Sequence, residues 1–294
     1  MHYTGTIWRP PYEAYSLLIQ VTAGCTHNSC KFCTLYEDLP FKFRLSPFNE
    51  VKEDLEEAGK FYKDVPRVFF TGANPFVLST DKLKTLAKMV REQYPSCETI
   101  GCFARVTDIT PKSIDELKEL RKLGYDSITI GVETGDDNAL SFMNKGYQAK
   151  DIIEQCRKLE EANIRYNFFY LTGISGSGRG EYGAKETAKV FNQLHPQIID
   201  ASMLTIYDNS ELYKEIQAGN WKEETEIEKL IELKTLISEL TVNARFATDG
   251  ASNLIQVRGN IVTDKAKMIQ SLDYQIENAD ERELRRYREN LRHL

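Results

Sequence analysis

The sequence predicts an α/β fold, a partial (β/α)6 TIM-like barrel with a mainly helical C-terminal extension. Short apolar runs alternate six times with amphipathic segments, which is the pattern of βαβ units and a parallel sheet. Six units are fewer than a closed eight-stranded barrel requires, so an open barrel is expected. The alternation ends near Tyr207, which predicts two domains: residues 1–207, a barrel with an N-terminal arm, and residues 208–294, an appendage packed on it.

Each predicted strand is an apolar run between turn residues, and most predicted helices begin at a capping side chain or a proline. Ser46-Pro47 opens the first helix, Thr80 caps the second, and Thr110-Pro111 starts the third, which Gly124 ends. The expected strands are 16–22, 67–71, 99–104, 127–132, 165–171 and 198–206. Further helices are expected at 136–144 (a short turn), 148–162, 181–194, 209–219, 223–242 and 263–294, with one more strand within 253–259.

Composition limits the class of protein. The chain has 294 residues, 28% charged and 41% hydrophobic, which is ordinary for a globular protein. A net charge of −6 gives no general attraction to nucleic acid. Neither a secretory signal nor an apolar run of about 18 residues is visible, so we expect no membrane contact and a cytoplasmic setting. The six cysteines are then expected to be reduced.

Three of these cysteines form the strongest motif in the chain. Cys25, Cys30 and Cys33 follow the first predicted strand at spacing C-x4-C-x2-C. Three thiolates can hold three irons of a cubane [4Fe-4S] cluster, and the fourth iron then has an open position. A structural zinc site is the alternative, but zinc needs a fourth ligand that the sequence does not offer. The other cysteines lie on predicted core faces and are read as small buried hydrophobes, with an auxiliary cluster as the alternative: Cys97, Cys102 and Cys156.

The loops after the predicted strands share an unusual composition. In a parallel sheet these loops meet at one edge, where ligands bind in barrels of this kind. After the cysteine loop come a glycine turn, an arginine, a carboxylate and a glycine-rich stretch: Gly72-Ala73-Asn74, Arg105, Glu133 and 173–180. The glycine-rich stretch lacks the Gly-Lys-Ser/Thr ending of a phosphate-binding loop, so nucleoside triphosphate binding is not expected. The sequence therefore predicts one binding site at this edge.

The cysteine loop resembles that of the radical S-adenosylmethionine (SAM) superfamily, and the resemblance covers roughly residues 16–207. The usual spacing there is C-x3-C-x2-C with an aromatic residue before the last cysteine, which Phe32 matches. This chain has one extra residue between Cys25 and Cys30, which we expect to bulge outward. The likeness is strongest to the branch with the methylthiotransferases, oxygen-independent coproporphyrinogen oxidase and the Elongator catalytic subunit.

This resemblance implies cofactor-binding roles for residues at the predicted edge. The turn Gly72-Ala73-Asn74 stands where the family receives the amino group of the methionine moiety. Arg105 and Glu133 match strand-end positions that bind the carboxylate and ribose of SAM. The stretch with Gly173 and Ser175 matches the glycine-rich turn near the adenine. Tyr36 and Tyr170 are candidates for relaying a hydrogen atom, with aromatic lining of the site as the alternative.

The resemblance also implies an activity: a radical SAM enzyme that reductively cleaves SAM to a 5′-deoxyadenosyl radical, which abstracts hydrogen from a substrate. An electron donor such as flavodoxin or ferredoxin is the implied partner. The acidic charge favours a small molecule or a protein as substrate, and RNA stays open. The alternative from another class is a non-catalytic iron–sulfur protein for electron transfer or assembly.

Overall fold

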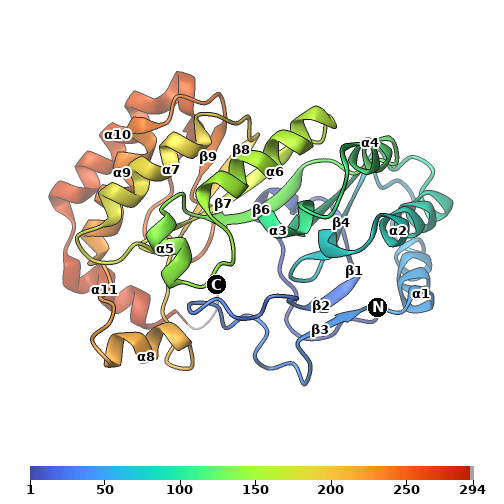
Figure 1. Ribbon diagram of the computed structural model, residues 1–294, viewed down its shortest axis with the longest axis horizontal. Coiled ribbons are helices and arrows are strands. Elements are labelled where there is room, and N and C mark those ends of the chain that lie inside the picture. The colour runs from blue at the N-terminus through green and yellow to red at the C-terminus, as the bar shows by residue number, and fades with distance from the viewer. Residues whose placement is uncertain (292–294) are drawn as a thin grey trace. The chain divides into compact units, whose positions relative to one another are not determined.

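The structure is a computed structural model that describes residues 1–291. It confirms the α/β fold class. Eight strands follow the order β1-β4-β5-β6-β7-β8-β9-β10 in one mostly parallel sheet, and β2 and β3 form a separate hairpin (Figure 1). The strands are β1 Leu17–Gln20, β2 Thr22–Gly24, β3 Phe43–Leu45, β4 Arg67–Thr71, β5 Thr99–Ala104, β6 Ile128–Glu133, β7 Tyr166–Thr172, β8 Ile198–Met203, β9 Arg245–Ala247 and β10 Arg258–Asn260.

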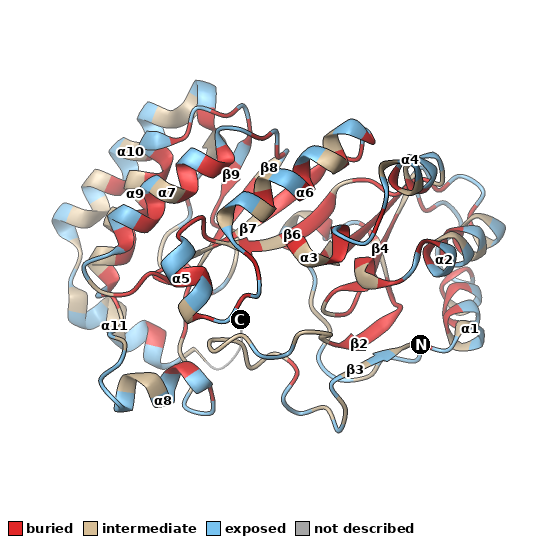
Figure 2. Cartoon of the chain, in the orientation of Figure 1, coloured by how far each residue is buried: buried red, intermediate tan, exposed pale blue. Residues whose placement is uncertain are grey.

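Helices separate the parallel strands, as the alternation predicted. They are α1 Phe48–Ala58, α2 Thr80–Gln93, α3 Val106–Ile109, α4 Ile114–Lys122, α5 Asp137–Phe142, α6 Ala149–Glu161, α7 Gly180–Phe191, α8 Glu211–Gln217, α9 Glu226–Glu239, α10 Ile261–Asn278 and α11 Glu281–Glu289, with 3₁₀ turns η1 Pro11–Glu13 and η2 Pro75–Val77. The last residues of the helix expected over 263–294 lie outside the described part of the chain. Figure 2 shows the helices buried on one side and exposed on the other, as amphipathic segments require.

Three helix starts differ from the prediction. Pro47, not Ser46, stands at the cap position of α1, and Thr80 is the first residue of α2, with Ser79 at its cap position. The third difference is the largest. Residues 106–109 form the short helix α3, and α4 begins only at Ile114, after the expected start at Thr110-Pro111. Ser113 caps α4 by accepting from the Glu116 backbone N–H, while the Glu116 carboxylate accepts from the Ser113 N–H at 2.8 Å. This reciprocal pair satisfies two N–H groups at the helix start, which Thr110 cannot do from its position.

The described chain divides into two compact units. The first comprises Met1–Asn28, Leu35–Gly131 and Gln155–Tyr166, and the second comprises Ser29–Thr34, Val132–Glu154 and the described chain from Asn167 onward. The second unit runs across the boundary expected at Tyr207, whereas the first unit lies wholly before it. The division into residues 1–207 and 208–294 stays a prediction.

The parallel register is regular within each unit. In the first, Leu17 of β1 pairs with Val68 of β4, and Phe103 of β5 pairs with Thr129 of β6. In the second, β8 pairs in parallel with both β7 and β9, and β10 closes the row antiparallel to β9. The C-terminal segment thus adds two strands to the sheet as well as helices. Within residues 1–291, none of the helices is long and apolar enough to cross a membrane.

Candidate functional site

In the first unit, the loop after β4 touches the chain just before Cys25. Gly72 has φ +124°, a conformation that favours glycine. A side chain at this position would overlap the hydroxyl and carbonyl oxygens of Thr22, which lies three residues before Cys25. Glycine is therefore required here for close packing of the two segments, and the neighbouring Ala73 is half-buried beside it.

Asn74 holds the start of the cysteine loop. Its buried amide Nδ2 donates to Thr26 Oγ1 at 2.8 Å and to both carboxylate oxygens of Asp108 at 3.1 Å. The Thr26 N–H donates back to Asn74 Oδ1 at 3.3 Å. The structure thus holds Asn74 against Thr26, the residue that follows Cys25 in sequence. The predicted contact of Asn74 with the amino group of SAM stays a prediction.

Sequence reasoning missed Asp108. This buried carboxylate accepts from the Arg105 backbone N–H at 2.7 Å and from Asn74, so it joins two of the predicted binding residues. Burial raises the pKa of Asp108 to about 6, against these hydrogen bonds. The signal that could have found it is the Arg-x-x-Asp spacing at the start of a helix, which is that of a capping box.

The Arg105 side chain lies at the start of α3, where its Nη1 donates to Thr107 Oγ1 at 3.0 Å. The other predicted residue of the first unit, Tyr36, is 8% exposed. Neither position tests the roles that the resemblance implies, so both stay predictions.

In the second unit, the rest of the cysteine loop is bound to the segment after α5. The Lys31 N–H donates to Met143 O at 3.1 Å, and Asn144 Nδ2 donates to Ser29 O at 2.9 Å. The Cys33 N–H donates to Cys30 O at 3.1 Å, so these two cysteines share one tight turn. The backbone that carries Cys30 and Cys33 is therefore fixed by hydrogen bonds on both sides.

Lys145, also missed, places a buried positive charge against this turn. Its ammonium forms an ion pair with Glu133 at 3.0 Å and lies 5.6 Å from the ring centroids of both Phe32 and Tyr147. Burial alone would lower the pKa of Lys145, but Glu133, Tyr147 and Cys30 raise it above its usual value. Lys145 is therefore charged, and it favours negative charge on its neighbours.

Glu133 ends β6 with φ +67°, a strained conformation for a residue with a side chain. From this strand end the Glu133 carboxylate forms the ion pair with Lys145. A cofactor at this strand end would therefore meet a carboxylate that is already held in place, and the ribose contact implied for Glu133 stays a prediction.

The glycine-rich turn of the second unit is held by carboxylates. The Gly173 N–H donates to Glu232 at 2.7 Å, and the Ser175 hydroxyl donates to Asp136 at 3.2 Å. Glu232 adjoins Glu224, and burial raises the pKa of both carboxyls above the usual value. The pair therefore holds a proton at neutral pH. Sequence reasoning missed it because both glutamates lie beyond the predicted barrel.

The structure places the Tyr170 side chain against α9. Its phenol is buried on the helix side of β7 and donates to Glu232 of α9. Burial, the largest cause, and the neighbouring Glu232 raise the pKa of Tyr170 far above its usual value. The Tyr170 hydroxyl is engaged between strand and helix, and the hydrogen-atom relay named for Tyr170 stays a prediction.

The six cysteines fall into two groups. The three of the motif, Cys25, Cys30 and Cys33, are half-buried with no disulfide, whereas Cys97, Cys102 and Cys156 are fully buried and burial raises the pKa of each of their thiols. The second group fits the prediction of small core residues, because a raised pKa disfavours the thiolate that a cluster needs.

The motif cysteines fit a cluster in donor type and accessibility, but their grouping is not shown. Cys25 belongs to the first unit and the other two to the second. Across the described 291 residues, no three His, Cys, Asp or Glu side chains meet as a set that could hold a metal ion. Ligation by all three thiols therefore stays a prediction.

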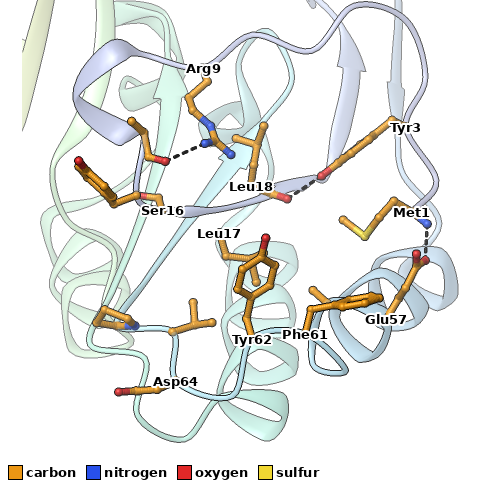
Figure 3. Close-up of a pocket in the computed structure, with 15 residues that line it drawn as sticks. Met1, Tyr3, Arg9, Ser16, Leu17, Leu18, Glu57, Phe61, Tyr62 and Asp64 are labelled. Atoms are coloured by element: carbon orange, nitrogen blue, oxygen red, sulfur yellow. Dashed lines mark hydrogen bonds and ion pairs between the residues drawn. The ribbon is translucent and has the colours of Figure 1, made fainter.

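A pocket of about 530 Å³ lies elsewhere in the first unit (Figure 3). Figure 3 shows Tyr3 and Arg9 of the N-terminal arm above the start of β1, with Phe61 and Tyr62 below. Leu17 opens β1, so this pocket is at the amino end of the strand. The loops of the predicted site follow the carboxyl ends, and the pocket is therefore separate from them.

The comparisons with known proteins agree with the motif. The model of the radical SAM superfamily matches residues 19–182, more than half of the chain. A tRNA uridine(34) acetyltransferase from Methanocaldococcus jannaschii is 21% identical over 79% of this chain and 50% of its own length. The chain thus spans about half the length of this curated relative.

Solved structures share the fold. Methylornithine synthase superposes with a TM-score of 0.55 and 14% identity over 92% of this chain and 85% of its own. Coproporphyrinogen III oxidase from Escherichia coli superposes with a TM-score of 0.55 and 17% identity over 76% of this chain and 51% of its own. With the family match and the cysteine motif, the chain belongs to the radical SAM superfamily of enzymes, whose cofactors are a [4Fe-4S] cluster and S-adenosylmethionine.

Proposed function

We propose that Cys25, Cys30 and Cys33 bind a [4Fe-4S] cluster and that the enzyme reductively cleaves SAM to abstract hydrogen from a substrate. One observation carries the proposal: side-chain amides from other parts of the chain hydrogen-bond to this cysteine loop near both of its ends. Asn74 holds Thr26 in the first unit, and Asn144 holds Ser29 in the second. Such anchoring suits ligands that must keep a set geometry.

When bound, the cluster supplies the electron that splits SAM into methionine and the 5′-deoxyadenosyl radical. The protein's own residues position the cysteines and orient SAM. Asn74 and Asp108 fix the first cysteine segment, and the Lys145 ammonium favours the thiolate form of Cys30. Gly173 and Ser175, held by Glu232 and Asp136, offer a rigid turn for the adenine.

The substrate of this proposal is a small molecule or a protein, and the electron comes from a flavodoxin or ferredoxin. The net charge of −6 supports this choice over RNA. A curated relative is a tRNA acetyltransferase. Hydrogen abstraction from an RNA substrate would therefore contradict this choice of substrate class. Six free cysteines support a reducing, cytoplasmic setting.

The experiment is anaerobic reconstitution with iron and sulfide, followed by reduction and addition of SAM. Wild type should bind about four irons per chain, as a cubane cluster requires, and release 5′-deoxyadenosine. Cys30→Ala should lose the cluster absorbance and the product. The matched control Cys97→Ala removes a buried thiol and should keep both. A wild type that forms a cluster but no 5′-deoxyadenosine contradicts the enzyme proposal, and an intact cluster in Cys30→Ala contradicts the ligand assignment.

A further inference from the structure

In the second unit, one face of the sheet packs on helices α7 and α9. Phe168 of β7 stacks on Phe191 of α7, with ring centroids 4.6 Å apart, so this face of β7 packs on helices. Tyr170 reaches α9 from the same face and pairs in register with Ala201 of β8. Side chains alternate along a strand. The residues between these therefore point to the opposite face, among them Phe169 and its register partner Asp200.

Asp200 is a polar residue on that opposite face whose carboxylate lacks a hydrogen-bond partner within residues 1–291. Its side chain belongs to a residue only 1% exposed, and within residues 1–291 neither carboxylate oxygen has a hydrogen-bond partner. Asn167, on the same face of β7, is 2% exposed and its Oδ1 is also without a donor in the described chain. Two adjacent strands thus present three buried acceptor oxygens on one face.

Buried polar groups are almost always satisfied, so this pattern needs a reason. The charged neighbours do not provide the missing donors. Arg245 of β9 and Arg258 of β10 both form ion pairs with Asp249 instead. The Asp249 backbone N–H approaches the Asp200 carboxyl without completing a hydrogen bond. Two arginines within reach therefore leave the Asp200 carboxyl open.

A polar loop lies at the same place. Asn253 Nδ2 donates to the carbonyl of Ala201, next to Asp200 in β8. A side chain at Gly250 would come within 3.1 Å of the Ser202 hydroxyl, which shares the face of Asp200. The loop 248–257 therefore lies against this part of the sheet.

We propose that Asp200 and Asn167 form a subsite that recognises a planar nitrogenous group with paired N–H donors, such as a guanidine, an amidine or an amino-substituted base. Both oxygens of one carboxylate are open, and a pair of parallel N–H donors matches that geometry. The subsite deepens the proposed function by naming a chemical group of its substrate. This proposal rests on the proposed function only where it identifies the ligand of the subsite as the substrate of the enzyme.

The test measures binding to the protein without SAM or reductant, so it does not depend on turnover. Agmatine carries the cationic form of the group, and guanosine carries a neutral form with paired N1–H and N2–H donors. Isothermal titration should show binding of at least one probe to wild type and equally to the control Asp208→Asn, which removes an exposed carboxylate. Asp200→Asn should weaken that binding at least tenfold. Binding of agmatine alone identifies a cationic ligand, and binding of guanosine alone identifies a neutral base.

If Asp200 had a purely structural role, Asp200→Asn would lower the melting temperature. The subsite proposal predicts the reverse: an open buried carboxylate destabilises the fold, so Asp200→Asn should raise the melting temperature while it weakens binding. A lower melting temperature in Asp200→Asn, unchanged binding in this variant, or no binding of either probe to wild type overturns the proposal. Formation of 5′-deoxyadenosine by wild type is measured separately, so failure of the subsite and failure of the proposed function give different results.

Discussion

At the scale of single residues, Lys145 shows how a buried charge can serve a neighbouring motif. It lies in the second unit beside Cys30 and Phe32, and Glu133 balances its charge. Bringing two charges out of water costs free energy, and a well-packed apolar pair is often as stable. The ion pair is therefore explained less by stability than by the negative charge that Lys145 favours on the cysteine turn.

Removing one partner of this pair should be costly. Lys145→Met leaves the Glu133 carboxylate, 16% exposed, without its counter-charge. We expect the free energy of unfolding to fall by about 3 kcal/mol, as for other broken buried pairs. The measurement is urea denaturation of the apo protein. The double variant Glu133→Gln/Lys145→Met should recover most of the loss, and the exposed Lys150→Met serves as control. An unchanged stability in Lys145→Met would contradict this account.

At the scale of elements, the sequence predicted what local pattern determines. The bounds 67–71 and 99–104 agree with β4 and β5, because buried parallel strands are continuous apolar runs. The strand β9 was missed because it has only three residues and begins with the exposed Arg245. The hydrogen bonds of Asn144 to the cysteine loop and of Glu232 to Gly173 join residues far apart in the chain, and no local pattern reveals them.

The close approach of the β4 loop to the chain before Cys25 can be tested through its glycine. Gly72→Ala forces a Cβ onto Thr22 at φ +124°. Overpacking and backbone strain should together lower the free energy of unfolding by about 3 kcal/mol. Gly178→Ala is a matched control, with φ +76° and no atom within 4 Å of the added Cβ.

The Gly178 control should cost about 1 kcal/mol, from backbone strain alone. Thermal and urea unfolding of the two apo variants measure the difference. Equal losses in both variants would show that contact with Thr22 is unimportant. Iron content after reconstitution should also fall in Gly72→Ala alone, since the displaced segment leads directly into Cys25.

At the scale of the whole molecule, both units keep carboxyl groups out of water. Burial raises the pKa of Asp108 in the first unit to about 6, and that of Asp200 in the second to about 7. Other carboxyl groups have a lowered pKa. Among them is Glu116, whose carboxylate accepts a hydrogen bond from the Ser113 backbone N–H. The groups with a lowered pKa contribute stability that is lost as pH falls below about 4. The carboxyl groups with a raised pKa, Asp108 and Asp200, contribute stability that is lost as pH rises through their folded pKa values. The free energy of unfolding should therefore be greatest near pH 5.

The Asp200 contribution can be isolated by its pH dependence. Its pKa rises from 3.8 in the unfolded chain to about 7 in the fold, so the folded state binds the extra proton between these values. Stability from this proton is full below pH 4 and is lost as pH rises to 7 and above. The shift of about three units corresponds to roughly 4 kcal/mol.

Asp200→Asn cannot lose a proton, so its stability advantage over wild type should grow by that order between pH 4 and 8. Asp249, Arg245 and Arg258 are the charged groups around Asp200, and they are the same in both proteins. Urea unfolding across this range measures the difference, and a constant gap between the two proteins would show that Asp200 is already ionised in the fold at pH 4.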